Sequence, residues 1–296
     1  MFDLALYLSE KRTRVDDHLS RFLSDAGAEG PLLAAMRYSL MAGGKRLRPI
    51  LCLAAAEAVG GDLEKCMAAA CALEMIHTYS LIHDDLPAMD DDVLRRGKPT
   101  CHVAFDEATA ILAGDALLTY AFAVLSAEQT VPQSQAVNWL AVIGKIATAA
   151  GPSGMIEGQI RDIRSEGKTL SLKALESLHA LKTGALIIAP VTCGAILSGA
   201  DQSQKMRLET YAARIGLAFQ VADDILNVEG DPALMGKAAG TDASRGKATY
   251  PSLLGLDQSR AFAADLVAQA LSALEPFDNA ADPLRAIARY IVTRKR

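Results

Sequence analysis

The sequence lacks the features that would support a disulfide framework, a zinc knuckle or a nucleic-acid site. Its 5 cysteines are an odd number and form no CxxC pair, which favours a reducing compartment, so we expect a cytoplasmic protein. The net charge of −5 draws the chain as a whole neither to nucleic acid nor to anionic membranes, and no basic recognition helix is present. Any anionic ligand therefore needs local positive charge.

Alternating β-branched runs are also rare, whereas apolar residues recur at three- and four-residue spacings typical of helices. The segments with this spacing are Leu32–Met41, Leu63–His83, Ala108–Ala127, Leu170–Leu181 and Leu208–Leu226. No linker and no fixed-period repeat divides the chain. The sequence therefore predicts an all-α fold, with residues 1–296 forming a single domain of many packed helices.

Two further segments have a clear composition. Thr183–Ala200 carries no charge over 18 residues, is short for a membrane span and contains glycine and proline, so we expect a buried core helix and no span. Glu229–Thr249 is polar and contains glycine and proline, which is typical of a long loop. Such a loop is either a functional lid or plain disorder.

Five aspartates crowd into nine positions of the segment HDDLPAMDDDVLRRG, residues 83–97. Their repulsion has to be relieved by water, by basic partners or by a metal ion. Pro87 argues against an unbroken helix, and a bend there would bring Asp90 back towards Asp84. Oxygen ligands without a nearby cysteine suit Mg²⁺ or Ca²⁺, although the spacing does not match an EF-hand. The alternative interpretation is a solvated acidic turn.

A second acidic stripe lies in the segment GLAFQVADDILNVEGD, residues 216–231. Gln220, Asp223 or Asp224, and Asn227 share one face of an otherwise apolar helix. Such a stripe either faces water or lines a cavity. Two acidic clusters on separate helices could face each other and hold several Mg²⁺ ions on one diphosphate.

Basic residues that could complete such a site come first in the segment GGKRLRP, residues 43–49. It is not a Walker A loop, because no Ser or Thr follows the lysine. Lys45 and Arg48, three residues apart, could contact one phosphate group, and Arg95 and Arg96 could hold the same anion by bidentate hydrogen bonds. The alternative for the glycine-flanked turn is a solvated basic surface.

Taken in order, these motifs resemble the short-chain trans-isoprenyl diphosphate synthases over nearly the whole chain, and most closely the bacterial farnesyl diphosphate synthases. The matching segments are GGKRLRP, EMIHTYSLIHDDLPAMDDDVLRRGKPTCH, the Lys182-Thr183 pair, FQVADDILNVEGD, and Gly240-Thr241-Asp242 with Lys247. The resemblance implies the isoprenoid synthase fold, an all-α bundle around a central apolar cavity, usually in a homodimer.

The resemblance also implies residue roles. Asp84 and Asp90, with Asp85 beside them, resemble Mg²⁺ ligands of the first motif, and Asp223, with Asp224 beside it, resembles the ligand of a further Mg²⁺, three ions in all. Residues resembling those that bind isopentenyl diphosphate are Lys45, Arg48, His77 and Arg96. Residues resembling those around the allylic diphosphate are Arg95, Lys182, Thr183, Gln220, Lys237 and Lys247. In the family, C-terminal basic residues, here Arg294, Lys295 and Arg296, tend to close over the site.

The second motif departs from the usual DDxxD at its last position, which is Asn227. An amide keeps an acceptor oxygen and loses the charge, which puts this residue in doubt as a ligand. The two preceding aspartates are unaffected.

The reaction that the resemblance implies is ionisation of an allylic diphosphate, attack by isopentenyl diphosphate and loss of a proton. In similar bacterial farnesyl synthases an aromatic residue sits five positions before the first motif, a place that Tyr79 occupies here, followed by the small Ser80. We therefore expect a farnesyl product. The alternatives are a geranyl or geranylgeranyl diphosphate synthase, a class I terpene cyclase, against which the GGKRLRP segment argues, and a non-catalytic partner subunit.

Overall fold

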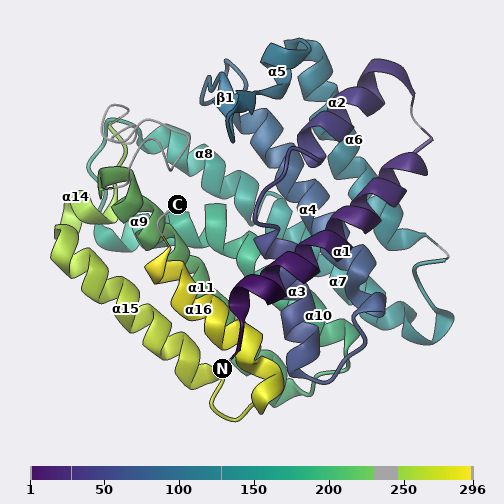
Figure 1. Ribbon diagram of the computed structural model, residues 1–296. Coiled ribbons are helices and arrows are strands. Elements are labelled where there is room, and N and C mark those ends of the chain that lie inside the picture. The colour runs from purple at the N-terminus through teal and green to yellow at the C-terminus, as the bar shows by residue number, and fades with distance from the viewer. Residues whose placement is uncertain (1, 28, 128, 230–245, 295–296) are drawn as a thin grey trace.

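The computed structural model describes residues 2–27, 29–127, 129–229 and 246–294, and these are almost entirely helical (Figure 1). The first half contains α1 (Leu4–Ser24), α2 (Gly30–Leu40), α3 (Leu47–Ala58), α4 (Glu64–Asp84), α5 (Cys101–Ala104), α6 (Glu107–Ser126) and α7 (Ala136–Ala150). The second half contains α8 (Met155–Ser165), α9 (Leu172–His179), the π-helix η2 (Ala180–Gly184), α10 (Ala185–Leu197), α11 (Gln202–Glu229), α14 (Tyr250–Leu254), α15 (Leu256–Ala273) and α16 (Asp282–Thr293).

The predicted all-α fold is confirmed, and each of the five apolar-periodic segments corresponds to helix. The spacing did not indicate three short elements. These are the 3₁₀ turns η1 (Gln133–Gln135) and η3 (Asn279–Ala281), and a hairpin in which β1 (Leu94–Arg95) pairs antiparallel with β2 (Lys98–Pro99). That the chain forms a single domain stays a prediction.

The core consists of two apolar clusters that meet along α3 and α10. One cluster is built mainly on α4, α6 and α7, and the other on α11, α15 and α16. Both α3 and α10 contribute to both clusters, because most of their residues are apolar and buried. The charge-free segment expected to form a core helix is α10, including its internal Pro190.

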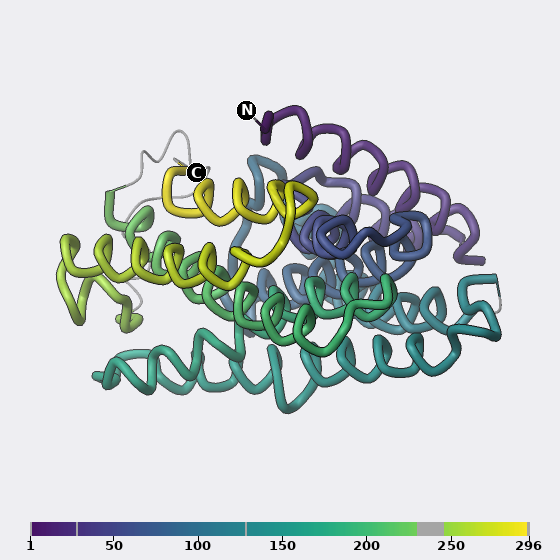
Figure 2. Tube along the Cα trace, turned by 90° about the horizontal axis from the view of Figure 1, so that it is seen from below, coloured from purple at the N-terminus to yellow at the C-terminus, as the bar shows by residue number. Residues whose placement is uncertain are grey.

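The two central helices approach each other through a small residue. A Cβ atom at Gly194 of α10 would lie 2.1 Å from the carbonyl oxygen of Cys52 on α3, so only glycine fits there. This contact fixes the spacing between the halves of the molecule. In Figure 2, α1 and α16 run along the upper side, and the teal part of the chain, which includes α7 and α8, runs along the lower edge.

In the part of the chain that the structure describes, two segments are long and apolar enough to cross a membrane by length and composition alone, α6 and Leu172–Leu197. The second is 67% buried inside the protein, as expected for a core helix. The corresponding window of α6 is only 39% buried, although the helix packs along α4. An apolar face of α6 is therefore left uncovered.

Candidate active site

The first acidic motif lies where α4 ends. The helix stops at Asp84, and the chain then folds back so that the N–H group of Asp90 donates to the carbonyl oxygen of Asp84 at 2.8 Å. Asp91 adopts a φ of 52°, in the left-handed region that reverses a chain direction. The bend predicted near Pro87 is confirmed, and it brings Asp90 back to the end of the helix.

The next carboxylate, Asp85, is held by the β-hairpin. Arg95 on β1 donates to its two oxygens, from Nε at 2.7 Å and from Nη2 at 2.5 Å, and Asp85 is only 3% exposed. Asp92 adds a second carboxylate 3.7 Å from the same guanidinium. Two-pronged contacts of this kind fix a guanidinium in direction as well as in place. The guanidinium of Arg95 is thus bound by carboxylates of the acidic motif in which it lies.

Asp84 has a different electrostatic environment. Burial raises the pKa of its carboxyl to about 6, Lys182 opposes the rise, and the charges of Asp90 and Asp85 add to it. Crowded carboxylates disfavour one another's ionised form. The Asp84 position therefore favours a proton or another cation.

A third carboxylate, Asp162 on α8, joins the two lysines of this region. Its Oδ2 accepts from Nζ of Lys182 at 2.6 Å and from Nζ of Lys247 at 3.2 Å. Lys247 also lies 3.7 Å from Asp90. Burial works against the charge of Asp162, yet the two lysines lower the pKa of its carboxyl below the usual value. The first motif, α8 and the residues before α14 are linked by these contacts.

The Lys182-Thr183 pair lies on the π-helix η2, which neighbouring helices approach closely on two sides. A Cβ atom at Gly158 of α8 would lie 2.2 Å from the backbone nitrogen of Lys182. One at Gly216 of α11 would lie 3.2 Å from the Cα atom of Gly184. Single π turns inside helices are frequent at functional sites. Here the glycines let η2 lie between the helices that carry the other polar residues.

The second acidic motif is connected to η2 by a chain of hydrogen bonds. The hydroxyl of Thr183 donates to Oε1 of Gln220 at 2.8 Å, and Nε2 of Gln220 donates to Oδ1 of Asp224 at 2.9 Å. The other oxygen of Asp224 accepts from the N–H group of Tyr250 at 3.0 Å, where α14 begins. Asp224 is 3% exposed. It therefore faces inward, fixes the Gln220 amide and anchors α14.

Asp223 faces the other way, towards the C-terminus. Nη2 of Arg294 donates to its Oδ1 at 2.6 Å and to the carbonyl oxygen of Phe219 at 3.2 Å. The guanidinium also lies 4.0 Å from the centre of the Phe219 ring. The C-terminal arginine that the resemblance places near the site does reach it, and it contacts the carboxylate expected to bind metal.

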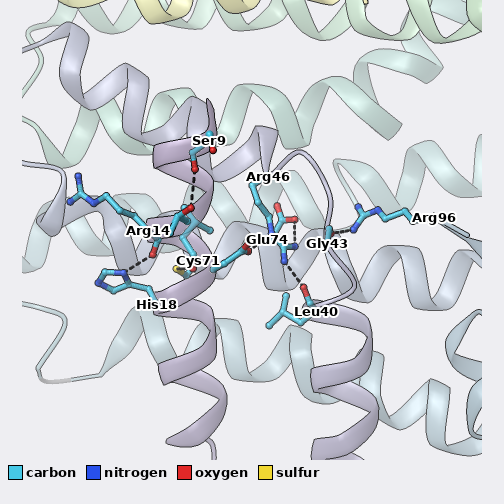
Figure 3. Close-up of polar contacts among 12 residues, drawn as sticks. Ser9, Arg14, His18, Leu40, Gly43, Arg46, Cys71, Glu74 and Arg96 are labelled. Carbon is cyan, nitrogen blue, oxygen red and sulfur yellow. Dashed lines mark hydrogen bonds and ion pairs between the residues drawn. The ribbon is translucent and has the colours of Figure 1, made fainter. Parts of the chain in front are cut away.

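A cluster of cations surrounds the start of α3. Arg96 donates to the carbonyl oxygen of Gly43, and its guanidinium fills the space beside Gly44 (Figure 3). Burial lowers the pKa of Arg48 to about 10, against the charges of Glu74 and Asp223. Burial also lowers the pKa of His77 well below its ordinary value, and Arg48 and Arg96 add to the effect. His77 is therefore a neutral neighbour of these arginines.

The remaining member of the predicted basic group, Lys45, is exposed and lines an apolar cavity of about 410 Å³. The cavity lies between the N-terminal half of α1 and α16, and both Phe219 and Arg294 belong to its wall. The basic turn thus borders this cavity, since Lys45 and Leu47 both line it.

The two residues expected to limit product length lie on α4. Tyr79 is 5% exposed, and its ring meets that of His83 edge-on at 5.7 Å. Burial raises the pKa of Tyr79 to about 12, and the charge of Asp84 adds to the rise. Ser80 is buried and donates to the carbonyl oxygen of His77 at 2.8 Å. Tyr79 is close enough to the acidic motif to respond to its charge.

Sequence reasoning did not single out two carboxylates and one cation, which are Asp162, Glu74 and Arg46. No local pattern marks them, because their partners lie on other helices. Arg46 belongs to the basic turn but is 2% exposed, unlike the solvated surface that was the alternative interpretation of this turn. Lys237 and most of the predicted loop Glu229–Thr249 lie outside the described residues, as do Lys295 and Arg296.

The oxygen ligands suit a magnesium ion that arrives with phosphate. Within the described ranges, no group of three His, Cys, Asp or Glu side chains is arranged to hold a metal ion by itself. Mg²⁺ usually takes one or two carboxylates and completes its shell with water and substrate phosphate. Asp84, whose pKa is raised by burial and further by the charges of Asp90 and Asp85, and the neighbouring Asp90 itself fit that description. The count of three ions stays a prediction.

Comparisons with known proteins agree on one family. A family model described as polyprenyl synthetase matches residues 29–282. A farnesyl diphosphate synthase of Haemophilus influenzae is 50% identical over 299 residues, covering 98% of this chain and 99% of that protein. A geranylgeranyl diphosphate synthase of Cyanophora paradoxa is 48% identical over 295 residues, covering 99% and 97%.

Comparison with solved structures gives the same family. The crystal structure of an FPP/GFPP synthase from Zymomonas mobilis, in its apo form, superimposes with a TM-score of 0.85 at 42% sequence identity, covering 97% of this chain and 99% of that one.

The raised pKa of Asp84 predicts that this carboxylate costs stability. Its folded-state pKa of about 6 lies above the ordinary value of 3.8, so the cost is absent below pH 3.8 and grows as the pH rises to about 6. In a chelating buffer at pH 7, Asp84→Asn should stabilise the protein by up to about 3 kcal/mol, and the gain should vanish near pH 4. Urea unfolding at both pH values measures this.

The matched control is Asp162→Asn. The lowered pKa of Asp162 means that its contribution to stability is present above the unfolded pKa and is lost as the pH falls through the folded one. This variant should therefore be destabilised at pH 7. An Asp84→Asn protein no more stable than the wild type at pH 7 would contradict the assignment.

Proposed function

Since this chain belongs to the polyprenyl synthetase family and is a trans-prenyltransferase, we propose that it condenses isopentenyl diphosphate with dimethylallyl or geranyl diphosphate to give farnesyl diphosphate. One observation carries the proposal. The Lys182-Thr183 pair lies between the two acidic motifs, since the charge of Lys182 acts on Asp84 of the first motif and Thr183 donates to Gln220 of the second. A diphosphate seated there would meet carboxylates, for Mg²⁺, and lysines together.

The allylic diphosphate is the substrate that we assign to this acidic end of the site. Lys182 and Lys247 would turn from Asp162 to the diphosphate oxygens and stabilise the negative charge that builds as the C–O bond breaks. Asp84, Asp90 and Asp223 would hold Mg²⁺, which would supply further positive charge to the leaving group.

Ionisation leaves an allylic cation that has to be kept from water and oriented. The Thr183 hydroxyl and the Gln220 carbonyl oxygen lie together, so this polar pair can face the cation from an otherwise apolar wall. The double bond of isopentenyl diphosphate then forms the new C–C bond, and the product loses a proton to the released diphosphate. No side-chain nucleophile is needed.

Isopentenyl diphosphate is assigned to the cation cluster at the start of α3. Arg48 and Arg96 come from two segments of the chain and both act on the neutral His77, and Lys45 precedes Arg48 in the basic turn. A class I terpene cyclase has no second diphosphate to bind, so this cluster supports condensation over cyclisation.

The farnesyl product is supported by the size of the side chain at position 79. Relatives of nearly equal identity bear the names farnesyl and geranylgeranyl diphosphate synthase, so overall similarity does not select a chain length. We assign the floor for the growing chain to this buried tyrosine next to the acidic motif, because an aromatic ring occupies the space that further isoprene units need.

We also propose that the protein works as a homodimer in the cytoplasm. Seven of the exposed large apolar side chains lie on α6, α7 and α8, and they are Ile111, Leu112, Val137, Leu140, Ile156, Ile160 and Ile163. A second copy of the chain would cover such a surface, since large exposed apolar patches mark interaction sites. The five cysteines are free and buried, which suits a reducing compartment.

The catalytic assignment is tested by incubating the purified protein with Mg²⁺, isopentenyl diphosphate and each allylic primer, and identifying the product by mass. Asp84→Ala and Asp223→Ala should each lower kcat by about a hundred-fold or more, because each removes charge that holds the leaving diphosphate. Asp257→Ala, a matched change at a side chain 99% exposed, should leave kcat unchanged. Near-normal turnover by the first two variants would refute the assignment.

Tyr79→Ala should lengthen the product, because it opens space beneath the acidic motif. Tyr79→Phe keeps the ring and should keep the wild-type product. Chromatography of the dephosphorylated products separates the chain lengths. A fifteen-carbon product from the alanine variant would remove Tyr79 as the floor.

The dimer is tested by light scattering, which should give twice the chain mass of 31.3 kDa. The double variant Leu112→Glu, Leu140→Glu should shift the mass towards one chain, because charges within a buried interface are costly. Met206→Glu is the control, since Met206 is 60% exposed on α11. A wild-type mass of one chain would exclude the dimer.

A further inference from the structure

Arg46 is a buried arginine in an unusual backbone conformation. In the sequence it stands between Lys45 and Arg48, two cations of the proposed isopentenyl diphosphate site. It precedes the first residue of α3 with a φ of 50° and a ψ of 35°, in the left-handed region. A side chain other than glycine or asparagine is costly there. Something in the surroundings has to hold this residue in place.

The guanidinium of Arg46 provides that hold by contacting three helices or their ends (Figure 3). Nε donates to Asp16 of α1 at 2.7 Å, Nη1 to Glu74 of α4 at 2.8 Å, and Nη2 to the carbonyl oxygen of Leu40 at the end of α2 at 2.7 Å. The side chains of Arg46 and Glu74 are 1% and 2% exposed. The ion pair is therefore excluded from water, where a charge needs its partner most.

Glu74 faces more than one cation. Its charge raises the pKa of Arg46, and it is the first of the charges that oppose the lowered pKa values of Arg48 and Arg96. Its second oxygen, Oε2, and the Nε atom of Arg48 are both buried without a hydrogen bond among the described residues. Glu74 thus lies below the cation cluster as its buried counter-charge.

The conformation of Arg46 sets the directions of its neighbours. Lys45 precedes the left-handed residue and Arg48 lies in the first turn of α3, so a change in the backbone at Arg46 would separate the two cations. The three-residue spacing of Lys45 and Arg48 allows both to contact one phosphate group but does not fix their directions. The three-helix contact of Arg46 is what gives that spacing a fixed geometry.

We propose that Glu74 is a positioning residue for isopentenyl diphosphate. Through its ion pair with Arg46 it holds the turn from Lys45 to Arg48 in the shape that receives the diphosphate of this substrate. The inference rests on the proposed function and extends it to a residue that contacts no substrate.

The effect should be confined to one substrate. Glu74 and Asp84 are ten residues apart on the same helix, a separation of about 15 Å at the usual rise per residue. The contacts of Lys182 and Lys247 with Asp162 do not involve Arg46. A loosened basic turn should therefore weaken binding of isopentenyl diphosphate and leave the allylic site intact.

The experiment compares Glu74→Met and Glu74→Gln with the wild type, using geranyl diphosphate as the second substrate. Glu74→Met keeps the volume and removes the acceptor, and it should raise KM for isopentenyl diphosphate by about ten-fold or more. KM for geranyl diphosphate and kcat should stay within about two-fold of the wild type. Glu74→Gln keeps one oxygen that Arg46 can bind, so its KM should fall between the two.

The matched control is Glu57→Gln. Glu57 is another helix carboxylate with partners on a neighbouring helix. It accepts hydrogen bonds from the hydroxyl of Tyr7 at 2.5 Å and from Lys11. It should lower the melting temperature without changing either KM, which separates a loss of stability from a loss of positioning. Arg46→Lys keeps the positive charge and loses the several N–H donors of the guanidinium group. It should show the same change in KM that is expected of Glu74→Met, so it tests the inference even if Glu74→Met folds poorly.

If the wild-type enzyme turns over both substrates, three results would overturn the inference. The first is an unchanged KM for isopentenyl diphosphate in folded Glu74→Met and Arg46→Lys. The others are an equal rise in the KM values for both substrates and a fall in the variants' KM for isopentenyl diphosphate, which would mean that Glu74 competes with the diphosphate. A wild-type protein that does not use isopentenyl diphosphate at all would instead refute the proposed function.

Discussion

The site depends on one constraint, which is that charges removed from water need opposite charges beside them. The carboxylates of α4, α8 and α11 meet this constraint in separate pairs. Asp85 binds Arg95, Asp162 binds Lys182 and Lys247, and Asp223 binds Arg294. Because each cation comes from a different part of the chain, these pairs draw the β-hairpin, η2 and the C-terminal helix together around the ends of two helices.

The ion pairs that hold the ligand-free protein together are also the groups whose partners a diphosphate with Mg²⁺ would replace. Asp84 is the exception, since its pKa is raised, and so it is the carboxylate most in need of a further cation.

Packing explains why these polar groups can lie so deep in an apolar protein. The π-helix η2 is approached by Gly158 of α8 and Gly216 of α11, where larger side chains would push the helices apart. Its polar side chains are therefore held at short range from both flanking helices, and Thr183 reaches Gln220 directly. The same principle acts at the centre of the molecule, where Gly194 lets α10 rest on the backbone of α3. Small residues set the spacing of the helices, and the spacing decides which polar groups meet.

Local sequence was enough to predict much of this arrangement. The 3.6-residue period identified the long helices, and the restriction that Pro87 places on a helix predicted the bend that returns Asp90 to the end of α4. The partners of the charges were not predictable in the same way. Nothing near Arg46 in the sequence shows that it leaves the basic turn and binds Glu74, because that contact is made by three helices that meet only in the folded chain. Asp162 and the split between the inward Asp224 and the outward Asp223 were missed for the same reason, since the direction of each depends on tertiary neighbours.

The helix α4 joins these observations, because it serves both proposed substrates. Near its middle, the carboxylate of Glu74 lies under the cation cluster, and at its end Asp84 and Asp85 form the acidic motif. A negative charge is needed at the first place so that several arginines can be buried together before any ligand arrives. At the second place, negative charge would let a metal ion bring in the proposed allylic diphosphate. Because a single helix fixes the distance between the two places, the separation of the two proposed diphosphate sites would be set by the α4 backbone rather than by mobile side chains.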